Sequence, residues 1–309
     1  MKIAFLMDPL ESVKAYKDTT FYMMLAGRER GHEVFYFNQS TLQTRNSSVY
    51  AMVSRLDVHA SVEKPFTVLE TRQSDLSDMD VVMIRTDPPF DRGYLYSTLI
   101  LDLLPAGTRV YNRPSGIRNW NEKLASLNYP QLTPRSVVTR SEQEICQLFD
   151  EFDRVTLKPV DGHGGKGIVF LDRNDPGNSR KINDATRGGR DMIIAQEYLV
   201  AATEGDKRIL LVDGEPIGAV LRVHAEGQEL NNLDQGAEAM PAELDSDDLR
   251  ICETLRSGLD QQGIFFCGID VIGGKLIEIN VTSPTCLQEL CRFSGIDHHH
   301  AIIERLESS

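Results

Sequence analysis

A glycine-rich run between two strand-like segments constrains the fold of this chain most strongly. The run, Gly162-His163-Gly164-Gly165-Lys166-Gly167, fits the spacing G-x-G-x-x-G of dinucleotide-binding folds. Those folds need a helix after the glycines, so that the pyrophosphate meets the helix N-terminus. Here the next segment, 168–172, is Ile-Val-Phe-Leu-Asp, which predicts a strand. The run is therefore expected to be the loop of an antiparallel hairpin, which disfavours a dehydrogenase.

The expected hairpin loop has two interpretations. Its backbone N–H groups can cover phosphates, because glycine lets the main chain approach a ligand closely. A plain flexible hairpin is the alternative. Lys158, at the end of the preceding strand 154–159, favours phosphate binding, since a lysine among apolar residues is costly to bury unless an anion meets it. Lys123 is a second candidate cation.

The first 112 residues alternate between strand and helix patterns. Strands are expected at 2–7, 32–37, 80–85 and 109–112, and helices at 20–30 and 92–104, with a polar, irregular stretch at 38–79. Such alternation implies a parallel sheet, whose ligands bind at the carboxyl ends of the strands. Asp8, Arg85 and Asp87 lie at such ends and are candidate site residues.

The rest of the chain predicts further strands and helices. Ser141-Glu142-Gln143-Glu144 is typical of a capping box, and Ser246 is expected to cap a helix that ends at Gly263. Strands are expected at 192–198, 209–212, 217–223, 265–272 and 276–281, with an acidic loop at 226–245 and a last helix at 299–306. Because adjacent helical residues face different directions, the run His298-His299-His300 predicts a solvated helix start rather than a metal site.

Charge and cysteine content exclude several classes of function. The chain has 309 residues, with 33 basic and 46 acidic side chains and a net charge of −13, which argues against nucleic acid or an anionic membrane as a partner. Five scattered cysteines without C-x-x-C spacing predict reduced thiols; a nucleophilic Cys286 is the alternative to a buried structural thiol. The apolar run before Asp8 is too short for a signal peptide, so a cytoplasmic protein is expected.

Three oxygen-bearing side chains are expected to converge on one hairpin near the C-terminus. Glu278 and Asn280 are two residues apart on a strand, so both face the same side. A two-residue turn would put Asp270 on the opposite face. A three-residue loop of Gly273, Gly274 and Lys275 would pair residue 272 with residue 276 and set Asp270 opposite Glu278. Two carboxylates and an amide oxygen then form a site suited to Mg²⁺.

The segment that follows resembles a known family. Glu278-Ile279-Asn280-Val281-Thr282-Ser283-Pro284-Thr285 is similar to the signature of prokaryotic glutathione synthetase, a member of the ATP-grasp superfamily. Further matching segments, in the same order, are Met7-Asp8-Pro9, Lys17-Asp18-Thr19-Thr20-Phe21, Arg85-Thr86-Asp87-Pro88-Pro89-Phe90, Asn121-Glu122-Lys123, Leu157-Lys158-Pro159, Gly205-Asp206-Lys207-Arg208 and Val212-Asp213-Gly214-Glu215-Pro216. The resemblance covers nearly the whole chain.

The resemblance implies a three-part α/β architecture. An ATP-grasp fold is expected, with a Rossmann-like N-terminal α/β domain at 1–120, a small lid domain at 121–190 and a C-terminal α+β domain at 191–309. ATP would lie between the last two. The expected reaction is an ATP-dependent ligation through an acyl phosphate, joining γ-glutamylcysteine and glycine. A homo-oligomer is expected.

The resemblance also implies the site residues. Those expected to bind ATP are Lys123, Lys158, Gly162, Gly164, Gly165, Gly167, Gln196, Glu197, Tyr198, Leu199 and Asp206. Asp270, Glu278 and Asn280 would hold Mg²⁺, with Mn²⁺ as the other candidate metal. Arg208 and Arg222 would be catalytic. The residues expected to bind the acid and amine substrates are Asp18, Arg85, Asp87, Asn232, Ser283 and Thr285.

One segment departs from the family pattern and leaves alternatives open. Where the family usually carries Arg-x-Asn followed by paired glycines, this chain has Leu230-Asn231-Asn232-Leu233-Asp234-Gln235-Gly236-Ala237. Since this loop would cover the reacting groups, the identity of the acid and the amine stays open. The alternatives are a related ligase with other substrates and a nucleotide-binding regulator without turnover.

Overall fold

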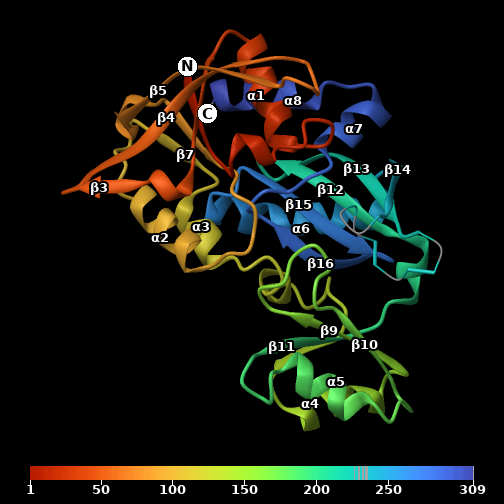
Figure 1. The fold of residues 1–309 in the computed structure, drawn as a ribbon. Coiled ribbons are helices and arrows are strands. Elements are labelled where there is room, and N and C mark those ends of the chain that lie inside the picture. Colours follow the sequence, from red (N-terminus) through yellow and green to blue (C-terminus); the bar gives the residue numbers. More distant parts are fainter. Residues whose placement is uncertain (226, 229, 232, 234–235, 309) are drawn as a thin grey trace.

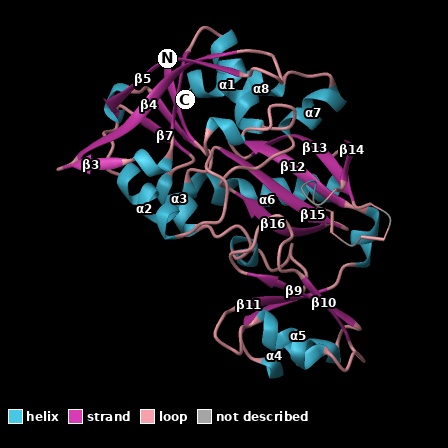
Figure 2. Cartoon of the chain, viewed as in Figure 1, coloured by secondary structure: helices cyan, strands magenta, loops and turns pink. Residues whose placement is uncertain are grey.

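In the part of the chain that the structure describes, the strands form three sheets. The computed structural model describes residues 1–225, 227–228, 230–231, 233 and 236–308. Figure 1 shows the three sheets along the chain, and Figure 2 shows how helices cover them. Among the described residues, no helix has the length and apolar character needed to cross a bilayer.

The N-terminal sheet is parallel in its centre and antiparallel at one side. Its strands are β1 (Lys2–Leu6), β2 (Glu33–Phe37), β3 (Gln43–Arg45), β4 (Ser48–Val58), β5 (Phe66–Asp75), β6 (Val81–Ile84) and β7 (Arg109–Tyr111). Strands β2, β1, β6 and β7 pair in parallel, as predicted. The expectation of an irregular stretch at 38–79 is wrong, because β3, β4 and β5 form antiparallel pairs there. Strand β5 is mostly exposed, so no apolar periodicity marks it in the sequence.

Helices from both ends of the chain fill the space between two sheets. Helices α1 (Thr19–Glu29), α7 (Leu287–Ser294) and α8 (His298–Ser308) contribute to one core with the N-terminal and C-terminal sheets. Phe5, Met24, Phe266 and Ile303 are members of this shared core. Helices α2 (Arg92–Leu101) and α3 (Pro114–Asn119) bury residues in the core on the other face of the N-terminal sheet.

A four-stranded sheet has a core of its own. Its order is β10-β9-β11-β8, from β8 (Ser136–Thr139), β9 (Arg154–Pro159), β10 (Val169–Asp172) and β11 (Ile193–Glu197). Helices α4 (Glu142–Gln147) and α5 (Asn178–Ala185) complete this core. Strands β9 and β10 pair antiparallel, which confirms the predicted glycine-rich hairpin.

The C-terminal sheet has the order β14-β13-β12-β15-β16. Its strands are β12 (Asp206–Val212), β13 (Glu215–Val223), β14 (Glu238–Ala242), β15 (Phe266–Ile272) and β16 (Lys275–Asn280). Strand β14 lies within 226–245, so the prediction of a loop throughout that stretch is wrong. Helix α6 (Ser246–Gln262) covers one face, and its N-cap is Asp245 rather than Ser246. The Asp245 carboxylate accepts hydrogen bonds from the N–H groups of Asp247 and Asp248, and Gly263 ends the helix as predicted.

A β-bulge sets the register between β15 and β16. The turn has two residues, Gly273 and Gly274, both with positive φ, so the predicted three-residue loop is wrong. Beyond the first two pairs, Ile277 is the extra residue of a bulge, and the pairing resumes with Asp270 opposite Glu278. The predicted position of Asp270 is therefore confirmed, although by another local structure.

The cysteine thiols are unpaired. Cys252, Cys267, Cys286 and Cys291 are buried and Cys146 is exposed. Burial raises the pKa of all five thiols. A buried, protonated Cys286 agrees with a structural thiol rather than a nucleophile.

The histidine run at the start of α8 is buried in part. His298 and His299 are only 8% and 6% exposed, so the predicted solvated helix start is wrong. The reason is that this end of α8 packs against α1, and Tyr22 lies 4.8 Å from the His299 ring between centroids.

Candidate active site

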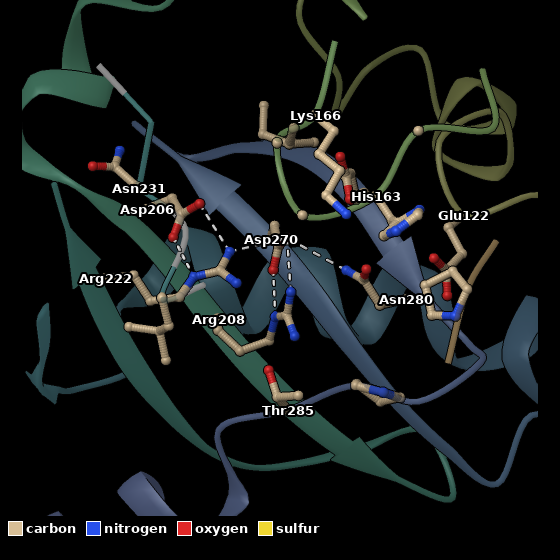
Figure 3. A pocket seen from close by; sticks show the side chains of 18 of the residues that line it. Glu122, His163, Lys166, Asp206, Arg208, Arg222, Asn231, Asp270, Asn280 and Thr285 are labelled. Carbon is tan, nitrogen blue, oxygen red and sulfur yellow. Dashed lines mark hydrogen bonds and ion pairs between the residues drawn. The ribbon is translucent and has the colours of Figure 1, made fainter. Parts of the chain in front are cut away.

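A cavity of about 730 Å³ gathers residues from the four-stranded sheet, from the C-terminal sheet, and from loops and the start of α1 in the N-terminal part. Twenty-one of the predicted site residues line it. They are Asp8, Asp18, Arg85, Asp87, Lys123, Lys158, Gly162, Gly164, Gly165, Gln196, Glu197, Tyr198, Leu199, Asp206, Arg208, Arg222, Asp270, Glu278, Asn280, Ser283 and Thr285. Figure 3 shows several of them beneath the loop that carries His163 and Lys166.

Among the described residues, one predicted site residue is not part of this lining. Gly167 packs against Pro159, where an added β-carbon would lie 2.7 Å from the proline Cγ, so its place is inside the hairpin. Asn232 lies outside the described residues. Next to it, Leu230, Asn231 and Leu233 line the cavity.

Two carboxylates and two guanidinium groups alternate across the C-terminal sheet. This arrangement follows from the register of the strands, because Arg208 is paired with Asp270 and Asp206 is paired with Arg222. Arg222 donates to both oxygens of Asp206, at 2.6 and 2.8 Å, and its Nη2 lies 3.0 Å from Asp270 Oδ2. Arg208 donates from Nε and Nη2 to the two oxygens of Asp270, the second bond being 3.0 Å long. The network appears in Figure 3.

The two carboxylates of this network differ in acidity. Burial alone raises the pKa of Asp270, but the charges and hydrogen bonds of Arg208 and Arg222 outweigh it and hold the pKa below its usual value. Burial raises the pKa of Asp206, and Arg222 only partly opposes this. Asp270 is therefore the permanent negative charge at the centre of the sheet face.

The predicted metal ligands lie on one face of two neighbouring strands. Asp270 and Glu278 are directly opposite, and Asn280 Nδ2 lies 3.4 Å from Asp270 Oδ2, so its amide oxygen stays available. The set consists of carboxylate and amide oxygens, which are the ligands that Mg²⁺ takes in proteins. The donors present therefore fit this cation.

Two buried ammonium groups approach the cavity from the other side. Lys158 is 8% exposed and donates to Gln196 Oε1 at 2.7 Å. Burial lowers its pKa to about 8, although the Glu278 charge acts in the opposite direction. Lys123 donates to the carbonyl of Gly162 and lies 3.4 Å from Glu278 Oε1. Lysines, glycine loop and carboxylates thus form one cluster.

A buried guanidinium forms the opposite end of the cavity. Arg85 is 4% exposed and donates to Thr20 Oγ1 at 3.1 Å and to the carbonyls of Thr282 and Pro284 at 3.3 and 3.0 Å. Burial lowers its pKa, and the carboxylates of Asp18 and Asp87 partly oppose this. A buried cation bonded to neutral oxygens attracts an anionic ligand. Nearby, the Ser283 hydroxyl donates to Asp87 Oδ1.

Glu122 is a half-buried residue of the cavity that the sequence analysis missed. Its Oε1 accepts hydrogen bonds from the N–H groups of Val281 and Thr282, at 2.9 and 3.0 Å, and from Thr282 Oγ1 at 2.8 Å. Its carbonyl accepts from Ile279 N. Burial raises its pKa. Glu122 therefore connects the segment that carries Lys123 to the end of β16. Its place next to Lys123 in the sequence was the feature that could have indicated its role.

Comparison with known proteins gives a consistent result. Residues 1–118 match the family described as prokaryotic glutathione synthetase, N-terminal domain, and residues 122–295 match its ATP-grasp domain. The glutathione synthetases of Synechocystis sp. and Gloeobacter violaceus are 38% and 40% identical over 99% of this chain and 99% and 96% of their own lengths. The crystal structure of D-cycloserine synthetase DcsG has the same fold, with a TM-score of 0.68 at 16% identity over 99% of this chain and 98% of that one.

Proposed function

We propose roles for the cavity residues on the premise that this chain belongs to the prokaryotic glutathione synthetase family. Members of the family are ATP-dependent ligases that form a C–N bond in glutathione biosynthesis, and this chain has that activity. The observation that supports the roles is the convergence of two lysines, the glycine hairpin and the Asp270–Glu278–Asn280 face in one cavity.

Nucleotide binding is assigned to the lid side of the cavity. Lys123 and Lys158 bind phosphate oxygens, and the backbone N–H groups of Gly164 and Gly165 cover them. The hinge residues 196–199 lie beside the adenine, and Asp206 contacts the nucleotide. The proposed division has an N-terminal part at 1–120, a lid at 121–190 and a C-terminal part at 191–309. The separate core of the four-stranded sheet supports the role of this part as a lid over the phosphates.

Asp270, Glu278 and Asn280 are assigned to Mg²⁺. A cation held there would neutralise phosphate charge during phosphoryl transfer. Asp270 is paired with Arg208 and Arg222. A bound cation would share the Asp270 charge with these two guanidinium groups, which would then also attract the anionic groups of the substrate.

The reaction needs charge stabilisation rather than a nucleophilic side chain. A carboxylate is a poor electrophile, so ATP converts it to an acyl phosphate, which the amine then attacks as phosphate leaves. Arg208 and Arg222 stabilise the negative charge on the transferred phosphoryl group and on the tetrahedral intermediate. Arg85, with Asp18, Asp87, Ser283 and Thr285, orients the acid and amine substrates.

The substrates follow from the family: γ-glutamylcysteine is the acid and glycine is the amine. The test is an assay of ADP, phosphate and peptide with Mg-ATP, each substrate alone, both together, and a panel of other acids and amines. Sustained turnover is expected only with both. Turnover with another pair and none with this one would contradict the substrate assignment and leave the ligase chemistry intact.

Assembly and location complete the proposal. A homo-oligomer is supported by the family and by Val68 and Leu69, which are 52% and 49% exposed on β5. Sedimentation equilibrium tests this assembly. A cytoplasmic location agrees with the unpaired cysteines.

A further inference from the structure

Two histidines and a carboxylate cluster at the junction of α1 and α8. Glu29 is the last residue of α1, and His299 and His300 lie in the first turn of α8. One candidate ligand atom from each residue lies within 4.8 Å of the other two. His300 Nε2 is 3.1 Å from Glu29 Oε2, and the two imidazole rings are 4.6 Å apart between centroids. The imidazole rings of the adjacent residues His299 and His300 therefore lie close together at the start of α8.

His299 is already oriented by its surroundings. It is 6% exposed, and its Nδ1 lies 3.6 Å from the Cys291 sulfur, which leaves Nε2 for another partner. A metal-binding histidine usually has its second ring nitrogen fixed by a neighbour in this way.

The geometry points to a divalent transition metal. Two ligands at tetrahedral positions around Zn²⁺, with bonds of roughly 2.0–2.2 Å, are about 3.4 Å apart. The Glu29–His300 separation is close to this value, and both side chains are at least partly exposed, so small rotations complete the set. Two imidazole nitrogens with one carboxylate oxygen favour zinc over magnesium.

We propose that Glu29, His299 and His300 form a Zn²⁺ site that fastens the end of α1 to the start of α8. The three residues lie outside the cavity lining, so this site is distinct from the proposed Mg²⁺ site. The opposite end of α1 reaches the cavity through Asp18, Thr19 and Thr20. The site binds the metal with three protein ligands and keeps a fourth position for water.

The experiment is a Zn²⁺ titration of the full chain, purified without a histidine tag, stripped of metal and held in excess Mg²⁺. Excess Mg²⁺ occupies the oxygen-rich face in the cavity. Calorimetry measures the dissociation constant, and the melting temperature gives an independent measure, because a ligand that binds the folded state raises it. The wild type is expected to bind one equivalent of Zn²⁺. The variants H300A and E29Q should each bind Zn²⁺ at least about tenfold more weakly than the wild type.

The control is H59A, which removes a histidine that lies 4.0 Å from Asp57 and is not one of the three proposed ligands. It is expected to bind Zn²⁺ as the wild type does. Circular dichroism verifies that all variants are folded, and neither His300 nor Glu29 is buried. Absence of binding by the wild type, or unchanged affinity in either H300A or E29Q, would overturn the proposal.

Discussion

Asp270 on β15 lies directly opposite Glu278 on β16, although the turn between these strands has only two residues. The extra residue Ile277 brings both carboxylates to one face, because a bulge shifts the side chains beyond it by one position. The proposed metal site therefore depends on a local irregularity of the hairpin. The two carboxylates nevertheless differ in their partners, and this difference can be measured.

Glu278→Gln is expected to lower Mg²⁺-dependent turnover about a hundredfold or more, because a charged oxygen ligand is lost. Its free energy of unfolding should change by less than that of Asp270→Asn, since Lys123 keeps its hydrogen bond to the carbonyl of Gly162 when the 3.4 Å ion pair is lost. Asp270→Asn should also cost up to about 3–5 kcal/mol of stability, because it weakens a buried pairing with two guanidinium groups.

Steady-state kinetics at varied Mg²⁺ and urea unfolding of the same samples separate the two effects. Glu215→Gln is the matched control, because Glu215 pairs with Arg256 and does not line the cavity. A Glu278→Gln variant with wild-type turnover and Mg²⁺ dependence would remove that residue from the site.

Nucleotide affinity is expected to fall as the pH rises through about 8. Burial lowers the pKa of Lys158 to about 8 in the free protein, and a bound phosphate raises it again. Binding therefore takes up a proton above pH 8, and the dissociation constant of metal-free ATP should rise by up to about tenfold per pH unit. Calorimetry between about pH 7 and pH 10 measures this slope.

Lys158→Arg is the control for this titration, because a guanidinium stays charged over the same range. Its affinity for ATP should vary little with pH. Equal slopes in the wild type and in Lys158→Arg would show that another group causes the dependence.

Glu122→Ala is expected to destabilise the protein by about 3 kcal/mol, because it leaves the N–H groups of Val281 and Thr282 and the Thr282 hydroxyl without their acceptor. The KM for ATP should rise as well, since Lys123 loses its anchor. Glu122→Gln keeps an oxygen acceptor and should stay within about 1 kcal/mol of the wild type. Urea unfolding of both variants is the measurement. If alanine and glutamine had the same effect, the three hydrogen bonds would not be the cause.

Leu230→Arg is expected to raise the ratio of peptide formed to ATP consumed. Leu230 lines the cavity at the place where related sequences usually have an arginine, and leucine cannot donate a hydrogen bond to an anion. If the loop that contains Leu230 shields the acyl phosphate less closely from water, the acyl phosphate is hydrolysed more often. Quantifying ADP and peptide in parallel gives the ratio. One-to-one coupling in the wild type, unchanged in Leu230→Arg, would show that the substitution is neutral.

The sequence predicts the elements that carry a continuous apolar run or a capping motif. The apolar strands β1, β6 and β9 and the capped helix α4 are found at or within a few residues of their predicted positions. The long pair β4–β5 could not be predicted, because the side chains of β5 are exposed and only its pairing with β4 makes it a strand. Strand β14 escaped prediction for the same reason, since no residue of it is buried.

Most residues of the candidate site could be predicted from the resemblance to the family. The contacts between these residues could not be predicted from the sequence. Strand spacing placed Glu278 and Asn280 on one face, but the bulge at Ile277 depends on backbone geometry that no residue type signals. The pairing of Asp270 with two arginines depends on the register of three strands. The role of Glu122 depends on the end of β16, about 160 residues further along the chain.

The buried cysteines have a consequence for the chemistry that surrounds this enzyme. A family that makes a thiol peptide works where disulfides of that peptide form whenever oxidants appear. Exchange with such a disulfide requires an accessible thiolate. Cys252, Cys267, Cys286 and Cys291 are buried, and burial raises the pKa of each of these four thiols. In the folded enzyme these four thiols are therefore poor targets for glutathionylation, and the exposed Cys146 is the thiol that an oxidised product can reach.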